Sequence, residues 1–179
     1  VFFTANQGAN KLFLNKGDFK FEDISDKAGF SKKDQWSTGV TMVDINNDGW
    51  LDIYVANAGN MMQEDLRKNQ LFINNHDLTF TDSAEAYGLA NNGYTTHASF
   101  FDYDMDGDLD CFMVNNSPIP VNTLNYANAR DIRAENSAVA DFLKGGGDHL
   151  YKNEGGKFVE VSAEAGIHGS LISFGLGVT

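Results

Sequence analysis

The sequence predicts an all-β fold made of repeated four-stranded sheets, and three observations carry this prediction. An acidic loop with one residue pattern occurs twice, and its two copies begin 58 residues apart. A short hairpin motif occurs three times, and its first two copies begin 59 residues apart. Short strands that recur at such an interval are typical of folds in which each small sheet stacks on the next.

The acidic loop reads D-x-[DN]-x-D-G-x-x-D at residues 44–52 and again at residues 102–110. Carboxylates at alternate positions followed by glycine suit a hard cation such as Ca²⁺, which takes about six to eight oxygen ligands and needs a sharp turn of the chain. Carboxylates this close together oppose one another's ionisation, and a divalent ion removes that repulsion. We therefore interpret both loops as metal sites.

The order of ligands follows by analogy with other calcium loops. Side chains at positions 1, 3 and 5 would bind the ion, position 7 would offer its backbone carbonyl, and an acid would close the shell. In an EF-hand the closing acid is a glutamate at position 12, but position 12 here is Val55 or Met113. The closing acid comes at position 9 instead, as Asp52 or Asp110.

Two other readings of the loops compete with this one. A solvated acidic turn is the usual fate of a single Asp-rich stretch, but here the pattern occurs twice with glycine in the same place. A helical calcium module of the dockerin type is the sharper rival. The residues that follow each loop, 51–56 and 109–114, are rich in aromatic and β-branched side chains, which favours strands. We therefore expect each loop to connect two strands.

The hairpin motif combines N-x-L-[FY]-x-N with a later F-x-[DE] and ends near a glycine. The first copy spans 10–23 with a glycine turn at 16–18, and a short helical turn from Ile24 to Gly29 follows it. The second copy starts at Asn69 and ends at residues 87–89. The third starts with Asp148 in place of asparagine and ends at residues 165–167.

One repeat unit contains four expected strands, which makes it the size of a propeller blade. These strands are Thr38–Val43, Asp52–Ala56, Gln70–Ile73 and Phe80–Asp82. The chain then divides into the end of one blade at 1–30, a blade at 36–89, a blade at 94–167 and the first strand of another blade at 173–179. We expect a β-propeller fragment of about three blades, cut from the middle of a longer protein.

An insert of about twenty residues lengthens the second interval between hairpins, because Asn69 and Asp148 are 79 residues apart. The surplus falls within 117–147, and residues 126–143 have plausible helical spacing. Insertions of this kind often serve binding, and a packing flap over the blade is the open alternative. The glycines at 145–147 lack the lysine and helix of a phosphate loop, so we interpret them as a hinge.

Composition excludes several kinds of partner. The 179 residues are 42% hydrophobic, which is typical of a globular domain, and the formal charge of −12 argues against nucleic acid or an anionic membrane. No run approaches the roughly 20 apolar residues that insert in a membrane. Cys111 is the only cysteine, so no internal disulfide is possible. Cysteine usage therefore does not indicate whether the protein resides in an oxidising or a reducing compartment.

These motifs resemble those of FG-GAP or VCBS repeat propellers, the architecture of the integrin α-subunit head. They are most similar to proteins related to cartilage acidic protein, which carry ASPIC/UnbV tails. The resemblance covers nearly the whole chain and implies a seven-bladed propeller with two Ca²⁺ sites in this part of it. The implied ligands are Asp44, Asn46, Asp48 and Asp52 in the first site, Asp102, Asp104, Asp106 and Asp110 in the second, and the carbonyls of Trp50 and Asp108. Because Asn46 replaces an aspartate, we expect the first site to bind more weakly.

The resemblance also implies a secreted or cell-surface location and a role in adhesion or ligand binding. We expect calcium to stiffen the loops, while the other loops or the insert hold a protein or glycan; Tyr126 is the candidate aromatic for a glycan. The four histidines are scattered without a nucleophile at catalytic spacing, so we expect no catalysis. A propeller within a secreted carbohydrate-active enzyme and a structural subunit of a surface assembly are the alternatives.

Overall fold

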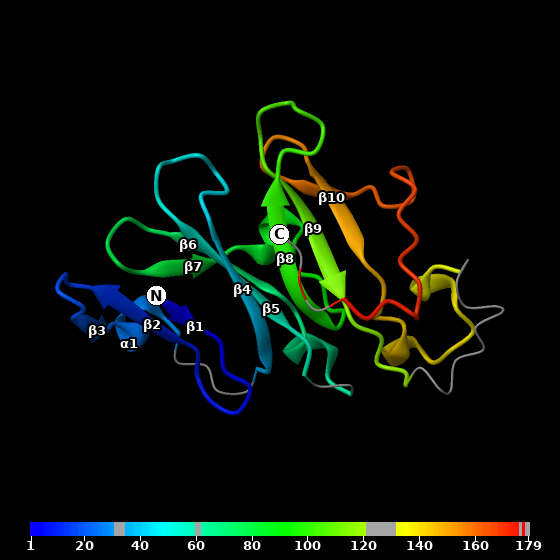
Figure 1. Cartoon of the computed structure of the whole chain (residues 1–179), viewed down its shortest axis with the longest axis horizontal. Coiled ribbons are helices and arrows are strands. Elements are labelled where there is room, and N and C mark those ends of the chain that lie inside the picture. Colours follow the sequence, from blue (N-terminus) through cyan, green and yellow to red (C-terminus); the bar gives the residue numbers. More distant parts are fainter. Residues whose placement is uncertain (31–34, 60–61, 121–131, 176, 178–179) are drawn as a thin grey trace.

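Three antiparallel sheets follow one another along the chain in the computed structural model (Figure 1). The structure describes residues 1–30, 35–59, 62–120, 132–175 and 177. The first sheet has three strands in the order β1-β2-β3, and the other two have four strands each. The strands of the first sheet are β1 (Phe2–Phe3), β2 (Lys11–Asn15) and β3 (Phe21–Asp23). The predicted all-β fold of successive propeller blades is confirmed.

The two complete sheets share one topology, in which each strand pairs with the next strand along the chain. The second sheet contains β4 (Ser37–Val43), β5 (Asp52–Asn57), β6 (Gln70–Asn74) and β7 (Phe80–Asp82). The third contains β8 (Thr95–Phe101), β9 (Asp110–Asn115), β10 (His149–Asn153) and β11 (Phe158–Glu160). The four strands expected from the sequence of the second sheet therefore form within one residue of their predicted ends.

Short helical turns follow the outer strands of the first two sheets. They are α1 (Ser25–Ala28) and α2 (Ala84–Tyr87), and a 3-10 helix, η1 (Glu64–Leu66), lies between β5 and β6. Gly88 ends α2 in the left-handed conformation with φ of 79°. A Cβ at Gly88 would also stand 2.5 Å from the carbonyl oxygen of Phe158 in the next sheet, so glycine serves both the turn and the close approach of two blades.

The hydrophobic core lies between successive sheets. One cluster joins the first sheet to the second, and Phe30 is at its centre, with ring centroids 4.9 Å from Phe2 and 4.7 Å from Phe72. A second cluster joins the second sheet to the third and includes Tyr54 and Met113, both almost fully buried. Each small sheet is thus stabilised by burying a face against its neighbour, as expected for blades.

Threonine side chains connect the innermost strands of adjacent sheets. Thr38 donates a hydrogen bond to the carbonyl of Thr95 at 2.6 Å, which links β4 to β8. Thr96, one repeat later, donates to the carbonyl of Gly175 at 2.9 Å. Gly175 therefore has the same position relative to β8 that Thr95 has relative to β4. This agrees with the predicted inner strand at 173–179. That assignment stays a prediction, because part of the segment lies outside the described residues.

The helical prediction for the insert is wrong over the residues that the structure describes. Residues 126–131 lie outside them, and 132–143 contain two short 3-10 helices, η3 (Ala134–Asn136) and η4 (Asp141–Leu143). Tertiary contacts override helical spacing here. The amide of Ala134 donates to the carbonyl of Gly169 at 2.8 Å, and Arg133, in extended conformation, donates to the carbonyl of Ile167 at 3.0 Å.

The glycines at 145–147 form a packed junction, so their interpretation as a hinge is also wrong. The carbonyl of Gly145 accepts a hydrogen bond from the amide of Tyr94 at 2.9 Å. Gly147 has φ of 96°, and a Cβ there would overlap the carbonyl of Gly169. Close backbone approach explains why glycine is required at this point of the fold.

The link between blades predicts a measurable loss of stability for Thr41→Val. The Thr41 hydroxyl donates to the carbonyl of Ala98 on β8 at 2.5 Å. Valine keeps the shape and removes the donor, so we expect the free energy of unfolding to fall by about 1 kcal/mol in urea titrations. Thr81→Val is the control, because its hydroxyl donates to Asn75 in the same exposed hairpin and so lies within one sheet. Equal losses in the two variants would contradict a special role for the contact between sheets.

Candidate metal centre

The two acidic loops project from the same edge of neighbouring sheets (Figure 1). The first connects β4 to β5 and the second connects β8 to β9, and each is closed by strand pairs at its base, Val43 with Asp52 and Phe101 with Asp110. The predicted placement of the loops between strands is therefore confirmed, and no helix follows either loop.

The first aspartate of each loop organises its backbone. In the second loop the Asp102 carboxylate accepts the amide N–H groups of Asp106 and Gly107, both at 3.1 Å. Gly107 and Met105 adopt positive φ values of 96° and 62°, which bend the chain around the carboxylates. The first loop repeats this arrangement: Asp44 accepts the amides of Asp48 at 3.0 Å and Gly49 at 2.8 Å, with positive φ at Asn47 and Gly49.

The last aspartate of each loop is fully buried and bonded to the backbone through both oxygens. Asp110 accepts the amide of Tyr103 at 3.0 Å and that of Asn153 at 2.8 Å. Asp52 does the same with Ile45 at 3.1 Å and Asn74 at 2.8 Å. These bonds show that the acid at position 9 ties the loop to the third strand of its sheet. Its predicted role as a metal ligand stays a prediction.

Two asparagines complete this tie, and their role was not predicted from the sequence. Asn153 donates from its side chain to the carbonyl of Leu109 at 3.2 Å, and Asn74 donates to that of Leu51 at the same distance. Their sequence signal is the final asparagine of N-x-L-[FY]-x-N. This asparagine recurs after each of the two acidic loops. That recurrence could have linked the hairpin motif to the acidic loop.

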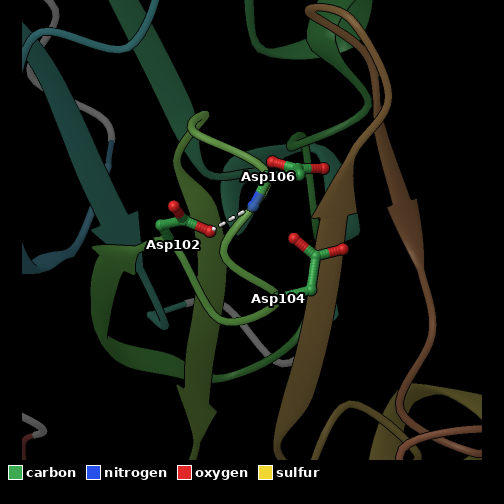
Figure 2. A group of neighbouring side chains, drawn as sticks. All are labelled: Asp102, Asp104 and Asp106. Carbon is green, nitrogen blue, oxygen red and sulfur yellow. Dashed lines mark hydrogen bonds between the residues drawn. The ribbon is translucent and has the colours of Figure 1, made fainter.

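Three carboxylates of the second loop converge (Figure 2). One oxygen from each of Asp102, Asp104 and Asp106 lies within 4.8 Å of the other two. Oδ1 of Asp104 and Oδ1 of Asp108 are buried and have no hydrogen-bond partner in the part of the chain that the structure describes. A compact set of oxygen donors with spare lone pairs fits a hard divalent cation.

The first loop presents a weaker set of donors. Asn46 donates from its amide to Oδ2 of Asp48 at 2.9 Å, and Nε2 of His76 lies 3.0 Å from the same oxygen. The His76 ring also stacks on Trp50, with centroids 5.1 Å apart. The hydrogen bond from His76 is the main cause that lowers the pKa of Asp48. At the four predicted side-chain ligand positions the first loop has one carboxylate fewer than the second, which is consistent with the expected difference between the sites.

Burial, with a smaller contribution from neighbouring charges, raises the pKa values of two aspartates in the loops. Burial is the main cause that raises the pKa of Asp52, and the charges of Asp48 and Asp44 add to it. Burial likewise raises the pKa of Asp108, with a further contribution from the charge of Asp106. Ionised carboxylates in this arrangement repel one another, and a bound cation would relieve the repulsion.

A polar cavity of about 480 Å³ lies where the insert meets the second and third sheets. Arg67 is buried there, with its guanidinium 4.6 Å from the centroid of the Tyr94 ring. The insert contributes Arg133, which contacts Glu135 and pairs with Glu160 at 3.1 Å. His149 on β10 is part-buried and lines the cavity. Tyr126 lies outside the described residues.

Comparison with known proteins places the repeat in a family. The model of the FG-GAP-like repeat matches residues 1–55 and 44–113. The chain belongs to the FG-GAP-like repeat family. Cartilage acidic protein 1 of Xenopus tropicalis is 32% identical over 116 residues, which are 64% of this chain and 17% of that protein. Human cartilage acidic protein 1 is 39% identical over 57 residues, which are 32% of this chain and 9% of that protein.

These matches confirm the resemblance predicted from the FG-GAP motifs. The matched part of this chain spans less than a fifth of the length of either relative. The shared region includes both acidic loops in the family model, so the loops described above belong to the repeat itself.

The buried carboxylate of Asp110 leads to a test that needs no metal. In Asp110→Asn an amide NH₂ replaces one carboxylate oxygen, so the N–H of Tyr103 or Asn153 faces a donor and loses its acceptor. We therefore expect the free energy of unfolding in chelator to fall by about 2 kcal/mol. Asp26→Asn is the control, because Asp26 is exposed on α1 and the same charge is removed. Denaturant titrations measure both values. Equal stability of Asp110→Asn and the unmodified protein would show that the tie is not needed.

Proposed function

We propose that this chain is a calcium-binding extracellular propeller module that binds a protein or glycan and carries out no catalysis of its own. The observation that carries the proposal is the convergence of three carboxylates in the second loop, where a buried oxygen of Asp104 has no hydrogen-bond partner among the described residues. Alternating carboxylates with a glycine turn are the donors that Ca²⁺ prefers in proteins.

The residues that would hold the ion are those predicted from the pattern. They are Asp44, Asn46, Asp48, Asp52, Asp102, Asp104, Asp106 and Asp110, with the carbonyls of Trp50 and Asp108. Bound calcium would supply positive charge to each crowded loop. Because each loop connects the inner two strands of its sheet and is tied to the third, a fixed loop would also stabilise the sheet.

Partner binding is proposed for the opposite end of the blades. The acidic loops precede β5 and β9, whereas η1 and the insert follow those strands, so the two sets lie at opposite ends. The 480 Å³ cavity at the insert end is lined by charged and polar side chains from both blades. A lining of this kind suits hydrogen bonding to a glycan or to polar groups of a protein.

A secreted or cell-surface location fits this proposal. Extracellular calcium modules operate with weak sites because calcium is abundant there, and two loops of unequal charge suit such conditions. The relatives found are both named cartilage acidic protein 1. Among the described residues, no helix has the length and apolar character needed to cross a bilayer.

The placement of the histidines supports a role without catalysis. His76 lies in the turn between β6 and β7, His97 on β8, His149 on β10 and His168 after β11. His76 contacts Asp48 and His149 contacts Glu160, which gives both side chains partners within the fold. A net charge of −12 also supports a partner other than nucleic acid.

Chelation tests the calcium proposal directly. We expect EGTA to lower the melting temperature of the intact protein, since a ligand at about 100 times its Kd adds roughly 2.7 kcal/mol to folding. Asp102→Ala should reduce the difference between melts with calcium and with EGTA, because it removes a ligand and the acceptor of two loop amides. Differential scanning calorimetry measures both effects.

Asp26→Ala is the matched control for this experiment, because it removes an exposed acid away from the loops. Its difference between calcium and EGTA should equal that of the unmodified protein. A melting temperature that EGTA leaves unchanged in the unmodified protein would contradict the proposed calcium sites.

A further inference from the structure

One position on the next-to-last strand of each sheet distinguishes the sheet of the second acidic loop from the other two. Leu14, Ile73 and Lys152 occupy the same register, each directly before an asparagine that pairs with the phenylalanine of the next strand. The first two sheets thus have an aliphatic side chain at this position, and the third has a lysine. The difference is a single charged group at an otherwise apolar site.

The lysine reaches the converging carboxylates. Its ammonium group is hydrogen-bonded to Oδ2 of Asp104 and lies 3.6 Å from Oδ2 of Asp106. Side-chain exposures are 31% for Lys152 and 23% for Asp104, so solvent only partly screens the pair. Ile73 packs instead against the core cluster between the second and third sheets.

We propose that Lys152 is a built-in counter-ion of the second loop that competes with the divalent cation for Asp104 and Asp106. This inference rests on the proposed calcium function. In the metal-free protein the ammonium group compensates part of the negative charge of the loop. Calcium binding then requires the lysine to leave these carboxylates or to stay nearby as a repelling charge.

The competition has two consequences that oppose each other. Without metal, the lysine stabilises the loop, because three neighbouring carboxylates keep a cation. With metal, the same lysine weakens the site, since a positive charge a few ångströms from a divalent ion costs free energy. The second loop has more carboxylates than the first, and Lys152 offsets part of the affinity that the extra carboxylate provides.

Backbone NMR resonances can follow the two loops separately in the intact protein. The amides of Gly49 and Gly107 donate to the first aspartate of their respective loops, so each reports on its own site. In a calcium titration we expect Lys152→Met to lower the midpoint at Gly107 by roughly tenfold and to leave that at Gly49 unchanged. In EGTA the same variant should melt at a lower temperature than the unmodified protein.

Two further variants separate charge from packing. Lys152→Arg keeps the positive charge and should retain the calcium midpoint of the unmodified protein within about twofold. Lys157→Met makes the same substitution at an exposed position in the turn after β10 and should change neither the midpoint nor the metal-free melt.

The outcomes are distinct. Calcium binding by the unmodified protein with the same Gly107 midpoint in Lys152→Met would overturn the role of Lys152 and leave the calcium proposal intact. Binding that appears only in Lys152→Met would support the competition in its strongest form. Absence of binding at Gly107 in both proteins would overturn the competition together with the calcium site in this loop.

Discussion

The acidic-loop end of the two complete sheets depends on one buried carboxylate per sheet. Asp52 and Asp110 are fully buried, and each accepts two backbone amides, one from the start of its own loop and one from the end of the third strand. An ionised group inside a protein is stable only when its oxygens are satisfied. This requirement fixes the loop, the inner hairpin and the third strand relative to one another.

With the loop backbone held in this way, the alternating aspartates point into a small volume. One oxygen from each of Asp102, Asp104 and Asp106 lies within 4.8 Å of the other two, and all three belong to one loop, so a single blade supplies this cluster. The blades themselves depend on each other through their cores and through threonine hydrogen bonds between inner strands. The carboxylate cluster is therefore local to one blade, while stability is shared between neighbours.

The sequence was a good guide to the fold, because its repeated motifs correspond to local structures. The aromatic and β-branched residues in 52–57 and the turn chemistry at Gly29 and Gly88 specify strands and caps without reference to the rest of the chain. The insert was not predictable in this way. Its helical spacing at 132–143 is overridden by Arg133 and Ala134, which bond to residues more than thirty positions later.

The site was predictable in its residue types and less so in their roles. Spacing alone identifies the acidic positions, but it does not reveal that Asp110 bonds to the distant amide of Asn153. Nor does it show that Lys152 lies beside Asp104, since 48 residues and an insert separate them. Both contacts depend on the pairing of β9 with β10, which is a tertiary feature. Knowledge of strand pairing was the missing information.

A crystal structure of the protein grown with Ca²⁺ tests the central claim most directly. Anomalous difference density should appear inside both loops, within bonding distance of Asp102, Asp104 and Asp106 in the second and of Asp44, Asn46 and Asp48 in the first. Lys152 should have moved away from Asp104. Loops that contain only solvent at saturating calcium, with the lysine still on Asp104, would contradict the account.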